Sequence, residues 1–186
     1  MNTAETYLIK ALGSYPWNIT EAMEAIEYGL AYDAEHPALL CLMGRICADH
    51  LHQYKNAVSY FEEALVADLH YPETYYHYLN LLIRLEQLDK AEKLTEQAFK
   101  VPGIDRYTIY INKSSVYEQR EQLKEALDMI TEARRHCYNK PASDFLDEEV
   151  TRINKKMDPE YKEDKAEEPR KHSFFERLGF RKTEKK

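Results

Sequence analysis

The feature that most constrains the fold of this chain is a ten-residue segment that recurs at a nearly constant interval. It appears four times, as EAMEAIEYGL (21–30), NAVSYFEEAL (56–65), KAEKLTEQAF (90–99) and EALDMITEAR (125–134). Each copy has alanine at its second position, at Ala22, Ala57, Ala91 and Ala126. Successive alanines are 35, 34 and 35 residues apart. A fixed period of this length predicts stacked copies of one unit, since a single copy cannot bury its apolar face alone.

A second small residue follows each alanine after seven positions, at Gly29, Ala64, Ala98 and Ala133. A larger residue lies between the two, at Ile26, Phe61, Thr95 and Ile130. Residues seven apart share one stripe of a helix, two turns from each other. The small residues are therefore expected to be buried where a neighbouring helix backbone comes close.

An apolar ladder precedes each segment, so each unit is expected to be a helix, a turn and a second helix. Pro37 and Pro72 are expected to open helices, where a missing N–H costs little. Asn18, followed by Glu21, predicts a capped start for the helix at 21–30, and Asp105 predicts another. With only 5 glycines, 7 prolines and 32% charged residues, almost no sheet is expected.

The repeat resembles the tetratricopeptide repeat (TPR) family, whose unit of about 34 residues has the pattern W-x2-L-G-x2-Y…A-x3-F…P. The second unit matches best, with LCLMG at 40–44 and AVSYFEEAL at 57–65. The first unit departs most, because its leading helix, at about 3–12, has Lys10 where the family has a small residue. The resemblance implies an all-α, right-handed superhelix (an α-solenoid) of about four helix hairpins.

The expected organisation is a TPR-like domain at 1–140, with units at about 3–36, 37–71, 72–103 and 104–140. A capping helix is expected at 141–157, where one apolar stripe runs along a charged helix, formed by Leu146, Val150, Ile153 and Met157. Residues 158–186 are expected to be a charged, disordered linker that ends in a basic aromatic tail.

The resemblance also implies a concave groove, lined by the first helix of each unit, that binds a peptide or a helical segment. In the register of the family the groove is lined by Arg45, Asp49, Tyr76, His77, Asn80, Arg84, Asn112, Ser115 and Gln119. Mixed aromatic and polar side chains suit recognition of an extended chain. The alternative is that these are ordinary solvent-facing helix residues.

The basic tail at 170–186 has 7 Lys or Arg against 2 Asp or Glu. Its apolar anchors form a predicted docking motif of Phe174, Phe175, Leu178 and Phe180. Anchors of this kind with basic flanks dock in a partner's groove or make weak contact with an anionic membrane surface. The tail could also fold back into the chain's own groove, or serve only as a solubilising end.

Catalysis and metal binding are not expected. His50 and His52 are two residues apart, so they cannot share a helix face, and no phosphate loop, nucleophile elbow or H-E-x-x-H motif is present. No cofactor is predicted. Nucleic acid is not expected as a partner, since residues 1–140 hold 14 Lys or Arg against 21 Asp or Glu.

The predicted location is cytoplasmic, because the chain has no long apolar stretch and no pattern of a signal peptide at its start. Cys41, Cys47 and Cys137 are expected to be reduced thiols inside helices. The preferred function is a non-catalytic scaffold or adaptor for a protein or peptide whose identity the sequence does not give. The alternatives are a membrane-peripheral assembly factor tethered by the tail and a regulator of an enzyme or signalling protein.

Overall fold

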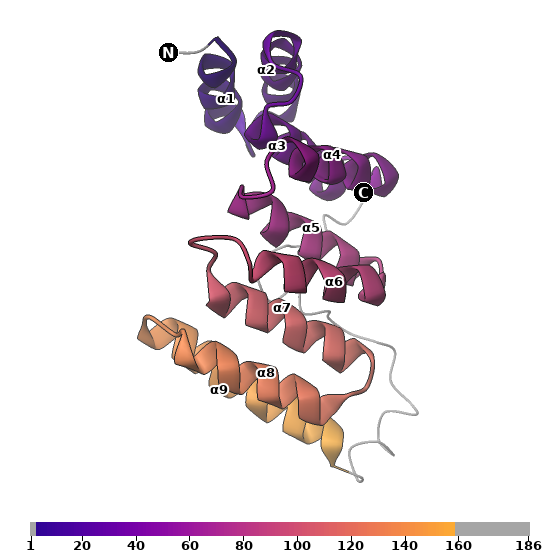
Figure 1. Ribbon diagram of the computed structural model, residues 1–186, viewed down its shortest axis with the longest axis vertical. Helices are drawn as coiled ribbons and strands as arrows, with labels where there is room; N and C mark the ends of the chain where they lie inside the picture. Colours follow the sequence, from indigo (N-terminus) through magenta and orange to yellow (C-terminus); the bar gives the residue numbers. More distant parts are fainter. Residues whose placement is uncertain (1–2, 159–186) are drawn as a thin grey trace. The chain divides into compact units, whose positions relative to one another are not determined.

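The computed structural model describes residues 3–158, and its regular structure there is entirely helical (Figure 1). The helices are α1 (Thr3–Ser14), α2 (Ile19–Tyr32), α3 (Pro37–Asp49), α4 (Tyr54–Ala67), α5 (Pro72–Arg84), α6 (Leu88–Ala98), α7 (Arg106–Gln119), α8 (Leu123–Arg135) and α9 (Lys140–Met157). The predicted all-α class is confirmed.

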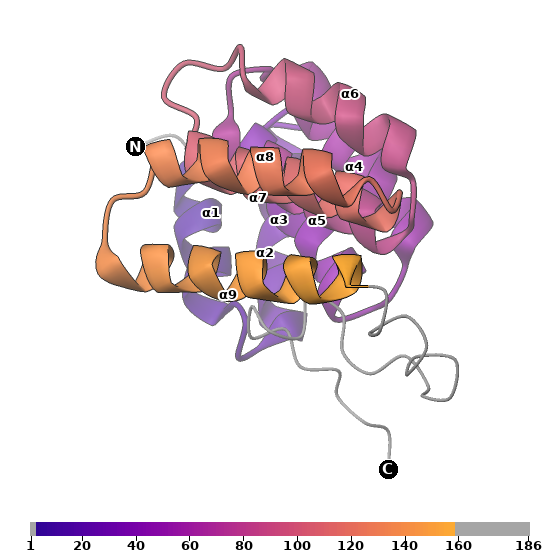
Figure 2. The same ribbon diagram turned by 90° about the horizontal axis from the view of Figure 1, so that it is seen from below.

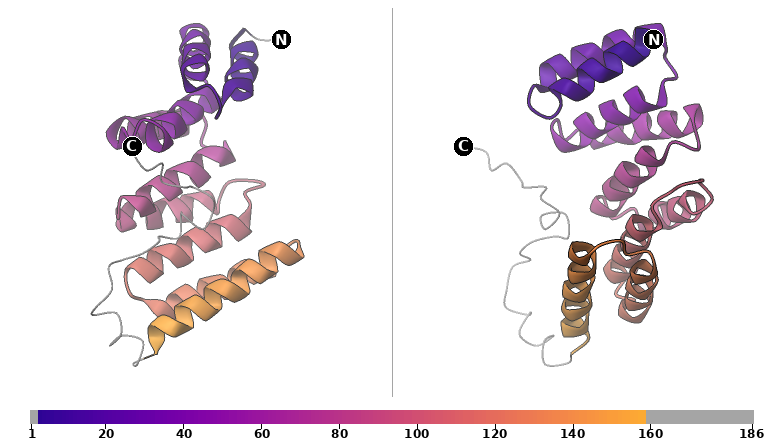
Figure 3. Two further views of the ribbon diagram at one scale, coloured as in Figure 1. Left: turned by 180° about the vertical axis from the view of Figure 1, so that it is seen from behind. Right: turned by 90° about the vertical axis from the view of Figure 1, so that its left-hand side faces the viewer.

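The chain divides into two compact units. The N-terminal unit consists of Met1–Leu82 and Lys93–Ile104, and the C-terminal unit of Ile83–Glu92 and Asp105–Lys186. The division therefore falls inside α5 and α6. In the N-terminal unit α1 packs with α2, and α3 with α4, as Figure 3 shows from two further directions. In the C-terminal unit α7 packs with α8, and α9 lies along α8 (Figure 2).

The helix boundaries follow the local signals in the sequence. Pro37 and Pro72 are the first residues of α3 and α5, as predicted. Asn18 caps α2, because its side-chain oxygen accepts a hydrogen bond from the Glu21 N–H at 3.2 Å while its amide donates to the Glu21 carboxylate at 3.1 Å. Asp105 caps α7 by accepting from the Tyr107 N–H at 3.1 Å. Both predicted caps are confirmed.

The repeated small residues are buried. The first alanines of the four segments, Ala22, Ala57, Ala91 and Ala126, are each 0% exposed. The small residues seven positions later, Gly29, Ala64, Ala98 and Ala133, are buried as well. At Gly44 of α3 the approach of α4 is so close that an added Cβ would lie 2.8 Å from the Phe61 ring. Small side chains therefore set how closely the helices of a hairpin pack.

The first unit departs from the family pattern at Lys10, as the sequence indicates. Lys10 is exposed, and the small buried positions of α1 are Ala4 and Ala11, both 0% exposed. The helix also continues to Ser14, two residues beyond the expected end at 12. Burying the Lys10 ammonium would leave a charge without water, and the buried small residues of α1 are Ala4 and Ala11 instead.

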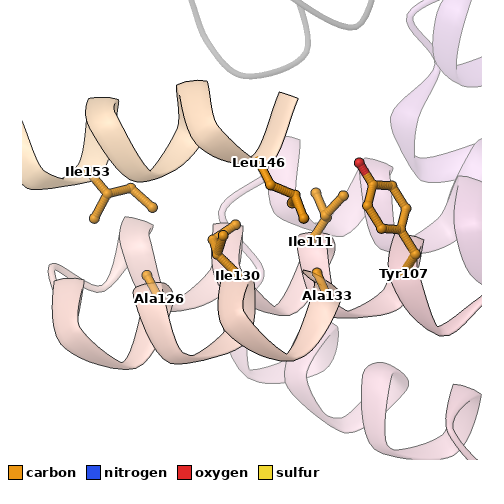
Figure 4. Close-up of a cluster of buried hydrophobic side chains, with 7 residues drawn as sticks. All are labelled: Tyr107, Ile111, Ala126, Ile130, Ala133, Leu146 and Ile153. Atoms are coloured by element: carbon orange, nitrogen blue, oxygen red, sulfur yellow. The ribbon is translucent and has the colours of Figure 1, made fainter. Parts of the chain in front are cut away.

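The last helix covers an apolar face of α8. Figure 4 shows Leu146 and Ile153 of α9 pointing toward Ala126, Ile130 and Ala133 of α8, and both α9 side chains are 0% exposed. Val150 is half-buried in the same cluster, whereas Met157 at the end of the stripe is 37% exposed. Because this stripe shields the apolar face of α8 from water, α9 acts as a cap.

Ion pairs also hold α9 against α7. The Arg152 guanidinium donates to Glu118 of α7 at 2.5 Å and to Glu149 of its own helix at 2.5 Å, and Lys156 also pairs with Glu118. Burial alone would raise the pKa of Glu118, but its hydrogen bonds from Arg152 and Lys156 outweigh burial and leave the pKa below its ordinary value of 4.5.

Replacing Gly44 by alanine is expected to lower the free energy of unfolding by about 1 kcal/mol. The added methyl group overlaps the Phe61 ring, which is 1% exposed and stacked on Tyr78, so the ring cannot move aside. Gly13→Ala is the matched control, because nothing lies within 4 Å of its Cβ position, and it should raise stability by about 0.5 kcal/mol. Urea unfolding measures both, and stabilisation by both changes would contradict the packing at Gly44.

Replacing Glu118 by glutamine is expected to lower the free energy of unfolding by about 3 kcal/mol at neutral pH, because Arg152 and Lys156 lose a shared buried partner. The lowered pKa means that the carboxylate stabilises the fold fully above pH 4.5 and less as the pH falls through its folded-state pKa. The difference between wild type and variant should therefore shrink in acid.

Asp144→Asn is the control for this change, since it removes an exposed pair with Lys140 on the same helix and should change stability little. Urea unfolding at several pH values makes the comparison. A Glu118→Gln penalty that stays constant into acid would refute the role given to this carboxylate.

Candidate functional site

Arg45, near the middle of α3, is the centre of the most distinctive polar cluster of the N-terminal unit. Its guanidinium carbon lies 4.8 Å from the centre of the Tyr15 ring, in the turn that follows α1. The same ring meets His50, at the end of α3, edge to face at 5.4 Å. The buried Arg45 Nε has no hydrogen-bond partner among the described residues.

His77, on α5, lies within the electrostatic reach of Arg45. Burial lowers the pKa of its imidazole to about 3, with a smaller contribution from the Arg45 charge. The ring is therefore neutral at physiological pH and has one donor and one acceptor nitrogen. A neutral imidazole beside a permanent cation suits hydrogen bonding to an uncharged peptide group better than it suits proton transfer at neutral pH.

The thiol of Cys41, one turn before Arg45 on α3, is expected to be unreactive. Burial raises its pKa to about 12, so the reactive thiolate is scarce at neutral pH. Burial also raises the pKa of Tyr71, which precedes α5, and the nearby Cys41 and Glu73 raise it further. The cluster thus contributes hydrogen-bonding groups and contact area but no activated nucleophile.

Two exposed apolar side chains of α1 lie, in sequence, between two residues that contact α3 or the residue before it. Glu5 reaches His36, immediately before α3, at 3.3 Å, and Tyr15 contacts Arg45 further along α3. Ile9 and Leu12 lie between these two contacts on the same stripe as Glu5, at spacings of four and three. They are 57% and 50% exposed, so this stripe of α1 presents two apolar side chains to solvent.

We use the name Arg45 surface for Ile9, Leu12, Tyr15, Arg45, Asp49 and His77. The sequence-based list contained three of these residues and missed the three from α1 and its following turn. The sequence analysis missed these residues because it did not assign which face of α1 is buried. Had Ala4 and Ala11 been taken as its buried contacts, the stripe of Ile9 and Leu12 would have followed from the helical period.

The predicted groove residues differ in their exposure. Those of α3 and α5 in the N-terminal unit are half-buried, namely Arg45, Asp49, Tyr76, His77 and Asn80. Arg84, at the end of α5, and Gln119, at the end of α7, are exposed. Asn112 and Ser115 of α7 are only 2% and 6% exposed, and the Ser115 hydroxyl donates to the Ile111 carbonyl at 3.1 Å. Asn112 and Ser115 therefore expose little surface in this structure.

Other predicted features have mixed outcomes. Cys41 and Cys47 are buried inside α3, whereas Cys137 is half-buried and lies beyond the end of α8, so the prediction that Cys137 lies in a helix was wrong.

Among residues 3–158, no three His, Cys, Asp or Glu side chains are grouped so as to hold a metal ion. In the same range no helix is long and apolar enough to cross a membrane. The docking motif of Phe174, Phe175, Leu178 and Phe180 lies outside the described residues.

The fold is that of TPR proteins. Among solved structures, the chain is similar to MamA 41-end from Desulfovibrio magneticus RS-1, with a TM-score of 0.68 and 18% identity over 84% of this chain and 86% of that one. A MamA RS-1 double mutant gives a TM-score of 0.69 and 18% identity over 86% and 87% of the two chains.

PilF of Pseudomonas aeruginosa gives a TM-score of 0.74 and 17% identity, over 83% of this chain and 69% of that one. No family model and no curated protein sequence matches the chain. At these identities the likeness establishes the fold, and the function has to be argued from the chain's own residues.

The imidazole of His77 is expected to remain neutral as the pH is lowered through 6.5, the ordinary value for histidine. In the unfolded chain it takes up a proton near 6.5, so its burial should make the fold less stable as the pH falls below that value. NMR titration of the His77 ring protons measures the pKa directly. Arg45→Gln should raise this pKa but keep it below 6.5, since burial is the larger cause, and titration of wild-type His77 near 6.5 would contradict the described burial.

Proposed function

We propose that the chain is a non-catalytic scaffold or adaptor, and that it binds a peptide or a helical segment of another protein at the Arg45 surface. The observation that carries this proposal is the exposed pair of Ile9 and Leu12, which lies in sequence between Glu5, in contact with His36, and Tyr15, in contact with the half-buried Arg45. An apolar strip next to convergent polar groups is the usual composition of a recognition surface.

The polar groups suit a peptide backbone. The Arg45 guanidinium is a planar fork of N–H donors, and the neutral His77 ring offers one donor and one acceptor. Tyr76 and Asn80 are half-buried on the same helix as His77. A tyrosine adds a large contact area and loses little conformational entropy, because it has only two side-chain torsions. Together these groups could bind carbonyl oxygens and amides while Ile9 and Leu12 receive an apolar side chain.

The scaffold function is also supported by the lack of an activated nucleophile or general base in the cluster of Arg45, Cys41 and His77. The Cys41 thiol is held in its protonated form by burial, and neutral His77 has too low a pKa to act as a general base near neutral pH. The similar structures share a fold that generally serves protein interaction. The membrane-peripheral alternative depends on residues 170–186, which lie outside the described residues.

The double change Arg45→Gln and Tyr76→Ala is expected to weaken partner capture about tenfold or more, which corresponds to the loss of one binding hot spot. The assay is quantitative mass spectrometry of the proteins that the full chain retains from a lysate of its native cells. Both side chains are half-buried, so the circular dichroism spectrum should stay helical.

Tyr28→Ala is the matched control, because Tyr28 is 59% exposed on α2, the second helix of its hairpin. It should leave capture unchanged. Undiminished capture by the double variant, or an equal loss with Tyr28→Ala, would count against a binding site that contains Arg45 and Tyr76.

A further inference from the structure

The two exposed apolar side chains of α1 belong to a longer stripe of that helix. Glu5, Ile9 and Leu12 lie four and three residues apart, so they share one helix face. The Tyr15 N–H donates to the Ala11 carbonyl at 2.9 Å, which continues the helical hydrogen-bonding pattern one residue beyond the end of α1. Tyr15 therefore lies one turn after Leu12 on the same face, and its ring contacts α3.

A carboxylate lies at each end of this stripe. At the first end the Glu5 side chain is 50% exposed, and one of its oxygens lies 3.3 Å from the His36 ring nitrogen Nε2. At the other end the carboxylate of Asp49, on α3, lies within electrostatic reach of Tyr15. Because ten residues of α-helix are about 15 Å long, the stripe from Glu5 to Tyr15 has roughly that length. Its pattern is acidic, apolar, apolar, acidic.

A third carboxylate, from α5, strengthens the negative charge at the first end. Burial is the largest reason that the pKa of Tyr71 is raised, and the charges of Glu73 and Glu5 add to it, so both carboxylates lie near the same hydroxyl. Glu73 is exposed in the first turn of α5. The N-terminal unit as a whole holds 5 Lys or Arg against 12 Asp or Glu. Its surroundings therefore favour a cationic occupant over an anionic one.

We propose that the partner of the Arg45 surface is an amphipathic helix whose short apolar stripe has a Lys or Arg at each end. On a helix with the pattern Lys-x3-Leu-x2-Leu-x3-Lys these four side chains share one face and span about 16 Å, which matches the stripe of α1. The two leucines cover Ile9 and Leu12, one cation approaches Glu5 and the other approaches Asp49.

This inference rests on the proposed function and adds the chemistry of the partner to it. Apolar anchors spaced three or four residues apart are the usual means by which a helix binds a protein surface. Charge pairs at the rim then fix the orientation and exclude partners of the wrong sign. The donors of Arg45 and neutral His77 suit the carbonyl groups that are left free in the last turn of such a helix.

NMR titration of the full chain with three synthetic peptides tests this chemistry. The first peptide has the pattern Lys-x3-Leu-x2-Leu-x3-Lys in an alanine-rich helical background. The second has glutamate in place of both lysines, and the third has serine in place of both leucines. The methyl signals of Ile9 and Leu12 should shift and saturate with the first peptide, whereas the other two should bind about tenfold more weakly or less. The Val66 methyl groups, 88% exposed on α4, should not shift.

Charge reversal in the protein tests the pairing. Glu5→Lys should weaken binding of the first peptide about tenfold and strengthen binding of the second, because repulsion replaces attraction. Glu24→Lys is the matched control, since it makes the same change in net charge at an exposed position of α2 and should alter neither affinity. Glu5 also contacts His36, so Glu73→Lys replaces Glu5→Lys if that variant loses helicity in its circular dichroism spectrum.

Three results would overturn the proposal. The first is binding of the acidic peptide as tight as that of the basic one, which would assign an anionic partner to Arg45. The second is an equal loss with Glu24→Lys and Glu5→Lys, which would leave only a general effect of net charge. The third is no shift of either methyl signal at millimolar concentrations of the basic peptide. The scaffold proposal is tested separately, because Arg45→Gln with Tyr76→Ala can reduce capture of a partner of any charge.

Discussion

Close contact between helices at small side chains is the constraint on which the hairpins depend. Four alanines spaced 34 or 35 residues apart have no exposed surface, and each has a second small residue two turns away. Gly44 shows how tight such a contact is, since no side chain fits between it and Phe61. The position of Arg45 beside Tyr15 likewise requires α3 to pack as it does on α2 and α4.

The period and the local start signals were enough to predict the helices. Pro37, Pro72, Asn18 and Asp105 all mark helix starts, because their effects act through the nearest backbone groups and need no tertiary contact. The cap at α9 was also predictable, since the stripe that includes Leu146 and Ile153 is apolar on a charged helix. Properties that depend on a few adjacent residues are therefore well encoded in the sequence.

The register of single helices was harder to predict. One residue turns a helix by about 100°, and this step separates an exposed Lys10 from a buried Ala11. For the same reason, the exposure of Ile9 and Leu12 could not be predicted without knowing which face of α1 is buried. Asn112 and Ser115 fall at groove positions in the register of the family, yet packing buries them, and only the tertiary structure shows this. The stacking of Tyr15 on Arg45 joins a turn to a helix 30 residues later and leaves no local signal.

The most direct test of the account is the melting temperature of four single variants, in which aspartate replaces Ala22, Ala57, Ala91 or Ala126, compared with Ala31→Asp at an exposed position of α2. Each of the four changes buries an unpaired charge at the same kind of helix contact, so each should cost several kcal/mol, about 3 or more, while Ala31→Asp costs little. A repeat alanine that tolerates aspartate as well as Ala31 does would show that the constant interval does not mark a helix contact, and the packing account would be wrong.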